Sequence, residues 1–272
     1  MTGAIVHTCK SCGNSFEGNF CNQCGEKVLH ASDRSFKKLM SNVVEAITFA
    51  DSKLLKTLGL VLGRPGFVTR EFIEGRRVKY MKPLSLFFVL NLVYFFFPVI
   101  QLFNASLNTQ LFSPLGRFYS TVLTAKLHRL NMDLNSFSLL YNLKTVALAK
   151  LMVMVFVFIS SLPLNLLYRK RNRFFTDHID YMVELACFNL FVNAIVLSVF
   201  AHFLGLGKYL NELALTVIFV STNLYFVVRS SYEFYGETWL RLVVKSLLMV
   251  IFLKIALEIY RSILFFVTLA SM

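Results

Sequence analysis

Long apolar runs alternate with short polar segments along most of this chain, and the pattern predicts membrane-spanning helices. Each run approaches the ~20 apolar residues that cross a bilayer core of ~30 Å. The runs cover residues 84–103, 146–167, 182–204, 213–228 and 240–269. We therefore expect an all-α polytopic membrane protein with about five transmembrane helices. The last run is long enough to be tilted or broken.

Shorter segments have helical periodicity but are too polar or too short to span. Residues 34–50 and 53–62 each place apolar side chains on one helical face. The second segment ends at residues 63–66, Gly-Arg-Pro-Gly, which is a strong turn signal. Residues 114–130 have a similar pattern. We expect these amphipathic helices at the membrane interface, or packed on the bundle.

Composition and charge agree with a membrane location and also indicate on which side of the membrane the N-terminus lies. Hydrophobic residues make up 56% of the chain and charged residues 16%, against about a quarter charged in soluble domains. The net charge is +13, and the basic residues sit beside the apolar runs. Thirteen Lys or Arg precede the first run, and four more lie within residues 169–173. The positive-inside rule therefore predicts a cytoplasmic N-terminus.

Four cysteines near the N-terminus form two Cys-x-x-Cys-Gly motifs. The four are Cys9, Cys12, Cys21 and Cys24. This spacing suits one tetrahedral site with four thiolate ligands and predicts bound Zn²⁺, although iron–sulfur and redox sites share the ligand type. Four protein ligands leave no open position for water, so we expect a structural ion. Reduced thiols also favour a cytosolic location for this segment.

The stretch between the two motifs bears on the partner of this small zinc ribbon. Phe16 and Phe20 could supply its hydrophobic packing, and the stretch contains no Lys or Arg. Contacts to nucleic-acid phosphates need cations. The sequence therefore argues against a nucleic-acid finger and favours docking on a cytoplasmic protein, with the lipid bilayer as the other partner.

Several ionisable residues fall inside the apolar runs. Glu184 and His202 lie in the third run, and Lys254 and Glu258 lie in the fifth with Arg261 close by. Such residues mark functional sites by default, because charge at membrane depth is costly. One interpretation is a proton- or substrate-handling cavity lined by Glu184, His202, Lys254 and Glu258. In the other, neighbouring charges neutralise one another along a helix face or snorkel to the interface.

A dense basic segment precedes the first apolar run and marks the boundary of the expected transmembrane domain. Its candidate lipid-headgroup contacts are Arg70, Arg76, Arg77, Lys79 and Lys82. We expect a zinc ribbon over residues 1–30. Amphipathic helices and the basic juxtamembrane segment follow over residues 31–82, and a transmembrane helical domain over residues 83–272.

Several of these motifs together resemble a known family. They are the double Cys-x-x-Cys-Gly head, the Leu54–Leu58 helix, the Arg64-Pro65-Gly66 turn, the Arg70–Tyr80 segment before Pro83, and the later Asp177–Tyr181 and Tyr232–Gly236 stretches. The combination resembles a family of bacterial multi-pass inner-membrane proteins of unknown function that carry an N-terminal zinc ribbon. The resemblance implies bound zinc and a location in the bacterial inner membrane, and it implies no reaction.

Three functional hypotheses follow from these patterns. The first is a membrane-anchored scaffold or regulatory protein whose ribbon docks a cytoplasmic protein. The second is a small transporter or channel that uses the intramembrane polar residues. The third is a membrane enzyme acting on lipid headgroups. The sequence holds no nucleophile–base pair, phosphate loop or HExxH motif, which favours a non-enzymatic role.

Overall fold

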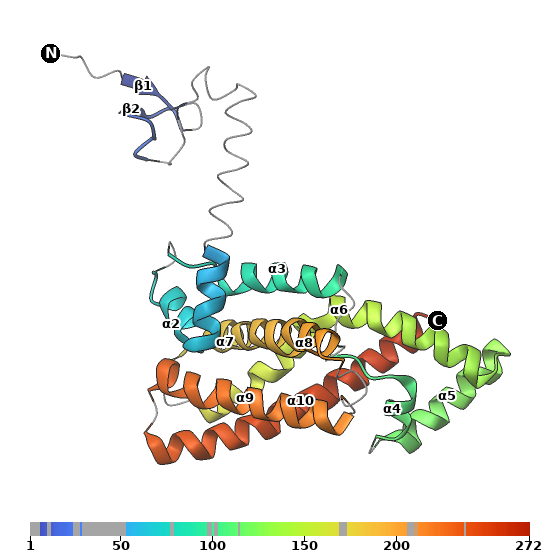
Figure 1. Ribbon diagram of the computed structural model, residues 1–272. Helices are drawn as coiled ribbons and strands as arrows, with labels where there is room; N and C mark the ends of the chain where they lie inside the picture. The colour runs from blue at the N-terminus through green and yellow to red at the C-terminus, as the bar shows by residue number, and fades with distance from the viewer. Residues whose placement is uncertain are drawn as a thin grey trace. The chain divides into compact units, whose positions relative to one another are not determined.

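The computed structural model of the chain falls into two compact units, Met1–Ser52 and Lys53–Met272. The structure describes residues 6–9, 12–23, 28, 53–76, 79–96, 100, 103–113, 115–168, 173–205, 210, 212–236 and 238–272 (Figure 1). The helix expected over residues 34–50, the cysteine Cys24 and the side chain of Arg77 lie outside these residues.

The N-terminal unit contains a two-stranded antiparallel sheet. Strands β1 (Val6–Thr8) and β2 (Ser15–Glu17) pair with His7 opposite Phe16. The Phe16 side chain is buried against Cys9 and Cys21, as expected. Phe20, however, is 61% exposed, so the prediction that it packs inside the unit is wrong. The apolar core of this unit is therefore very small among the described residues.

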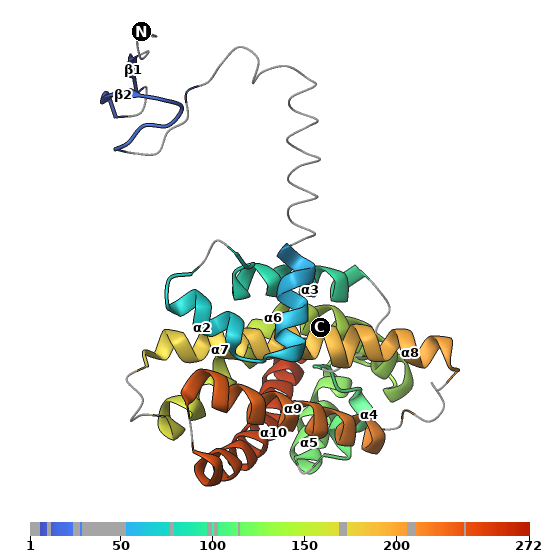
Figure 2. The ribbon, with the colours of Figure 1, turned by 60° about the vertical axis from the view of Figure 1, so that its left-hand side comes forward.

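The second unit is mostly helical. A helix over residues 53–63 leads through a turn into the labelled elements α2 (Phe67–Ile73), α3 (Pro83–Phe96), α4 (Leu107–Leu111), α5 (Gly116–Leu130), α6 (Leu134–Leu167), α7 (Phe175–Phe188), η3 (Asn189–Val196), α8 (Leu197–Phe203), α9 (Glu212–Tyr235) and α10 (Trp239–Ala270). Elements α7, η3 and α8 continue as one rod, in yellow to orange in Figure 2.

Three of the helices in the described part of the chain are long and apolar enough to cross a membrane. They are Leu134–Leu167, Phe175–Phe203 and Leu213–Tyr235. Helix α3 has 14 residues and so measures about 21 Å, short of the ~30 Å hydrocarbon core. Helix α10 is long and unbroken over 32 residues, but its apolar sequence is interrupted by charges. The structure thus supports a membrane protein and leaves α3 and α10 outside this set of three.

Aromatic side chains from several helices form the centre of the helical unit. Phe103 lies with its ring centroid 5.4 Å from that of Phe156 on α6 and 6.4 Å from that of Tyr260 on α10. The sequence pattern assigned Phe103 to the first spanning helix, but residues 103–106 are not helical. The Phe103 ring instead lies between α6 and α10. Burial of such a ring is a large hydrophobic contribution, which explains why the non-helical segment is held there.

Amide side chains link the π-helical segment η3 to α9. Asn189 and Asn223 exchange hydrogen bonds of 2.9 and 3.0 Å, and Asn193 Nδ2 donates to Thr222 Oγ1 at 2.9 Å. All three asparagines are buried. Side-chain hydrogen bonds of this kind hold helices together where apolar burial gives no net drive, as in lipid. They fix how α9 lies against the α7–α8 rod.

Candidate functional site

The candidate metal centre is the Cys cluster, which consists of Cys9, Cys12 and Cys21. Their Sγ atoms all lie within 4.8 Å of one another, and those of Cys12 and Cys21 are 3.6 Å apart. The first motif folds as a tight knuckle, in which Gly13 N donates to Cys9 O at 2.9 Å. Gly13 has φ 73°, a left-handed conformation that glycine adopts without a steric penalty. The knuckle therefore turns two sulfur atoms towards one point.

Three converging thiols could hold a metal ion. Soft sulfur ligands select zinc, copper(I) or iron–sulfur clusters over hard cations. Cys9 and Cys21 are buried and Cys12 is exposed, so the cluster lies at the edge of the sheet unit. Cys187 is a separate thiol, buried on α7.

A second arrangement of polar groups lies at the start of α2 and is named here the Glu184 junction, comprising Gly66, Thr69 and Glu184. Gly66 N donates to Glu184 Oε1 at 2.8 Å, and Thr69 N donates to Glu184 Oε2 at 2.8 Å. The Thr69 hydroxyl donates to the same Oε2. The first amides of a helix have no partner within the helix. Here a buried carboxylate from α7 serves as their acceptor.

Gly66 permits this contact because of both its backbone conformation and its size. Its φ is 83°, and it precedes the first residue of α2. A Cβ atom at this position would lie 2.9 Å from Ser230 Cβ and 3.2 Å from Phe234 Cβ, both on α9. The turn therefore packs directly against α9 while its amide reaches α7. A larger residue would push the turn away from both helices.

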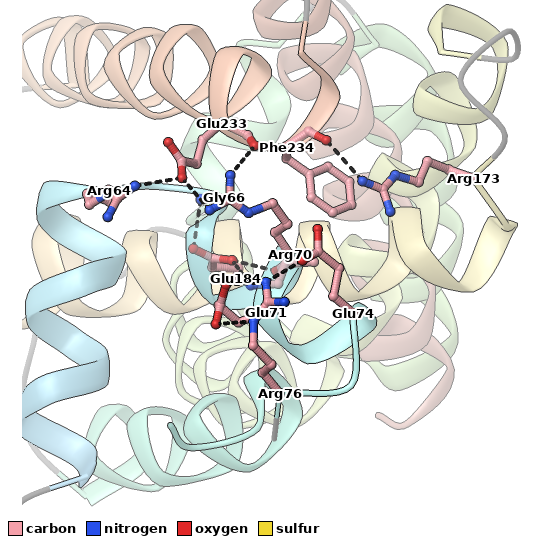
Figure 3. Close-up of polar contacts among 11 residues, drawn as sticks. Arg64, Gly66, Arg70, Glu71, Glu74, Arg76, Arg173, Glu184, Glu233 and Phe234 are labelled. Atoms are coloured by element: carbon pink, nitrogen blue, oxygen red, sulfur yellow. Dashed lines mark hydrogen bonds and ion pairs between the residues drawn. The ribbon is translucent and has the colours of Figure 1, made fainter. Parts of the chain in front are cut away.

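Ion pairs on α9 add to this attachment. Glu233 Oε1 lies 2.9 Å from Arg64 Nη2 and 2.9 Å from Arg70 Nη2, and the Glu233 carbonyl accepts from Arg70 Nη1 at 3.2 Å. Arg173, which precedes α7, donates to the Phe234 carbonyl at 3.3 Å and stacks over its ring (Figure 3). Two of these contacts use carbonyls at the end of α9, where cations are favoured by the helix dipole.

The far end of α2 has its own charged cluster. Arg76 Nε and Nη2 donate to the two oxygens of Glu71 at 2.7 and 2.6 Å, and Arg76 also contacts Glu74. The hydrogen bond from Arg76 lowers the pKa of Glu71, and the charges of Arg76, Arg70 and Lys79 act in the same direction. Partial burial opposes the shift. The pKa of Arg76 is raised in turn.

The candidate headgroup residues consequently fall into two groups. Arg70 and Arg76 pair with carboxylates of the protein, whereas Lys79 and Lys82 are exposed. Arg77 lies outside the described residues. Sequence reasoning grouped these five by charge alone.

The four residues predicted at membrane depth, Glu184, His202, Lys254 and Glu258, do not come together in one place. Glu184 is occupied at the junction, and His202 lies on α8. Lys254 and Glu258 form an ion pair of 2.9 Å on α10, joined by Arg261 at 3.5 Å. This α10 group borders a cavity of about 610 Å³ whose lining includes neither Glu184 nor His202 among the described residues.

One segment of the chain is similar to a family of unknown function. Residues 51–95 match a family model described as "Protein of unknown function (DUF3667)". The matched residues cover the helix 53–63, α2 and all but the last residue of α3, and they include Gly66 and Thr69. No curated protein and no solved structure matches the chain.

Sequence reasoning identified Gly66 and Glu184 separately but did not connect them, and it missed Thr69. It identified Glu184 as costly at membrane depth and read the Arg-Pro-Gly turn, but it did not predict α2 or pair the two. Thr69 and Ser230 gave no signal, because small hydroxyl residues are common everywhere. The usable clue was the combination of a turn glycine with a carboxylate that no nearby cation in the sequence could neutralise.

We predict that Gly66→Ala destabilises the protein far more than Gly75→Ala. Both glycines have positive φ, 83° and 88°, so both substitutions cost about 1–2 kcal/mol of backbone strain. Only at Gly66 does the new Cβ meet other atoms, which adds about 1–3 kcal/mol of overpacking. Thermal unfolding in detergent measures the difference, and equal losses for the two variants would contradict the packing described.

We also predict that Glu184→Gln lowers the stability by about 2–3 kcal/mol, because an amide has one acceptor oxygen for three donors. Glu233→Gln is the matched control, with the same isosteric change at a carboxylate that is partly solvated. We expect it to cost about 1 kcal/mol or less. Thermal unfolding of the two variants side by side is the measurement, and a ranking in the opposite order would count against the junction.

The Glu71–Arg76 pair predicts a specific pH dependence. Because the folded pKa of Glu71 lies below its ordinary value of 4.5, the pair stabilises the fold above that pH and the contribution is lost as the pH falls through the folded pKa. The melting temperature of wild type should exceed that of Glu71→Gln by a constant amount from pH 8 to 6. Below about pH 4.5 the gap should shrink. A gap that stays constant to pH 3 would contradict this assignment.

Proposed function

We propose that this protein is a membrane-anchored scaffold or regulatory protein whose N-terminal unit, stapled by a structural Zn²⁺, docks a cytoplasmic protein partner. The observation that carries the proposal is the convergence of the Cys9, Cys12 and Cys21 sulfurs. Cys24 would be the fourth ligand, since its motif repeats the first. With four thiolates the ion would be closed to substrate and would act as a staple.

The small core of the N-terminal unit supports this role for the metal. Its buried apolar side chains among the described residues are Cys9, Phe16 and Cys21. So little burial cannot offset the entropy of ordering a chain, so metal binding would supply much of the folding free energy. The role of the N-terminal unit would then be to present a binding surface.

That surface has the composition of a protein-docking site. Phe20 and Val6 are each more than 60% exposed, although the unit has few apolar residues to spare. Exposed aromatic side chains are common anchors in protein interfaces. The absence of Lys and Arg between the two cysteine motifs argues against nucleic acid in the same place.

The membrane placement is the second part of the proposal. We propose that α3 and α10 join the three candidate spans to give five crossings. The N-terminus would then be cytoplasmic, as the positive-inside rule and the reduced thiols favour. The bacterial inner membrane as location rests on the family resemblance. A transporter role has less support, because the Glu184 carboxylate is committed to Gly66 and Thr69.

The metal is tested by elemental analysis of purified full-length protein. We expect about one zinc per wild-type chain and per Cys187→Ser chain, and below about one tenth of that for the double variant Cys9→Ser/Cys24→Ser. Cys187→Ser is the matched control because its thiol lies in the helical unit. Equal zinc in all three proteins would overturn the metal assignment.

The docking role is tested with Phe20→Ser, which removes an exposed ring and should leave zinc bound. Quantitative pull-down should recover a common set of proteins with wild type and Cys187→Ser. Phe20→Ser and the double cysteine variant should each lose that set. If the recovered proteins are the same for all four, the N-terminal unit is not the docking surface.

A further inference from the structure

The cavity beside α10, named here the α10 cavity, is not used by the proposed function. Its volume is about 610 Å³. Lys254, Glu258 and Arg261 form one wall, the segment from Asn104 to Ser113 forms a polar second wall, and the first turns of α9 contribute apolar side chains. The cavity therefore has both a charged wall and an apolar wall.

Among the described lining residues, this wall presents two cationic side chains and one carboxylate. Glu258 Oε1 faces two cations, Lys254 Nζ at 2.9 Å and Arg261 Nη1 at 3.5 Å. Arg261 Nη2 also donates to the Asn104 carbonyl at 3.4 Å, so the guanidinium lies directly beside the polar second wall. The side chains of Lys254 and Glu258 remain 43% and 39% exposed, so a ligand can reach them.

The position of these charges along α10 explains why an anion would be favoured. Counted from Trp239 at 1.5 Å per residue, Lys254 lies about 22 Å and Arg261 about 33 Å along the helix. Trp239 begins α10 beside the end of α9 that carries Glu233, so the cavity lies towards the opposite end of the bundle. A cation there approaches the far boundary of a ~30 Å hydrocarbon layer. An anionic headgroup at that level would offset the cost of burying it.

Two neighbouring features indicate which other groups the ligand would carry. Asn104 Oδ1 lines the cavity region, is buried, and accepts no hydrogen bond from any residue in the described ranges. A buried acceptor of this kind is usually satisfied by a donor, which a ligand hydroxyl would provide. Beside the charged wall, Ile251, Ile255 and Ile259 form an exposed apolar stripe along α10. The stripe suits an acyl chain.

We propose that the α10 cavity binds a phosphate oxyanion, held by Lys254 and Arg261, with a hydroxyl of the ligand donating to Asn104. Phosphate offers several acceptor oxygens to an ammonium and a guanidinium at once. Glu258 keeps the two cations in place and competes with the ligand for them. The group can come from a phospholipid headgroup or from free phosphate, and the apolar stripe favours the lipid.

The experiment uses detergent-purified full-length protein and native mass spectrometry. Three probes are titrated: short-chain phosphatidylglycerol, inorganic phosphate, and a diacylglycerol of equal chain length that lacks phosphate. We expect one phosphatidylglycerol per chain and no retained diacylglycerol. Lys254→Gln/Arg261→Gln should weaken the binding at least about tenfold. The matched control Arg241→Gln/Lys245→Gln removes the same two charge types earlier on the same helix and should change it less than about twofold.

Glu258→Gln keeps the test falsifiable if the double variant folds poorly. It removes the competing carboxylate, so binding should tighten by about three- to tenfold. If inorganic phosphate binds with this same order of variants and phosphatidylglycerol does not, the oxyanion site stands and its source is a free anion. Diacylglycerol retention equal to that of phosphatidylglycerol, or affinities that do not differ among the variants, would overturn the proposal.

Discussion

The first amides of α2 need hydrogen-bond acceptors, and the fold supplies them from a helix more than a hundred residues further along the chain. Glu184 on α7 accepts from both Gly66 N and Thr69 N, and all three residues are removed from solvent or nearly so. A buried donor or acceptor left alone costs about 1–3 kcal/mol, so neither partner is stable in this place without the other. The short helix α2, the turn before it and the rod α7–α8 are therefore held as one piece.

The other polar contacts extend this piece to α9. Glu233 ties Arg64 and Arg70 to the end of α9, and the asparagine pair Asn189–Asn223 ties its middle to η3. Apolar packing alone is a weak guide to helix register when the surroundings are as apolar as the core. Directional hydrogen bonds at the end and in the middle of α9 fix its position along the helix axis, which hydrophobic contacts alone would not determine. Glu184, which the sequence analysis treated as a candidate for transport, thus has a structural role in the same attachment.

Much of the fold was readable from local pattern. The apolar runs located α6, the α7–α8 rod, α9 and α10, and Pro83 does stand at the start of α3. Contacts between residues far apart in the sequence could not be predicted. Phe103 looked like the end of an apolar run, but the chain leaves the helix and places the ring between α6 and α10. Periodicity describes one element at a time, so it carries no information about which helix supplies a cap or a packing partner.

The separation between Gly66 and Glu184 also has a consequence for biosynthesis. The segment that carries α2 leaves the ribosome first, and the α7 and α9 surfaces that receive it are made more than a hundred residues later. At typical synthesis rates the α2 amides wait on the order of ten seconds for their acceptor. During that time α2 has no bundle to join, so it must wait at the membrane surface or in water. Assembly of this bundle thus brings later helices back onto its beginning, and Gly66 is where an early turn of the helical unit meets α7 and α9.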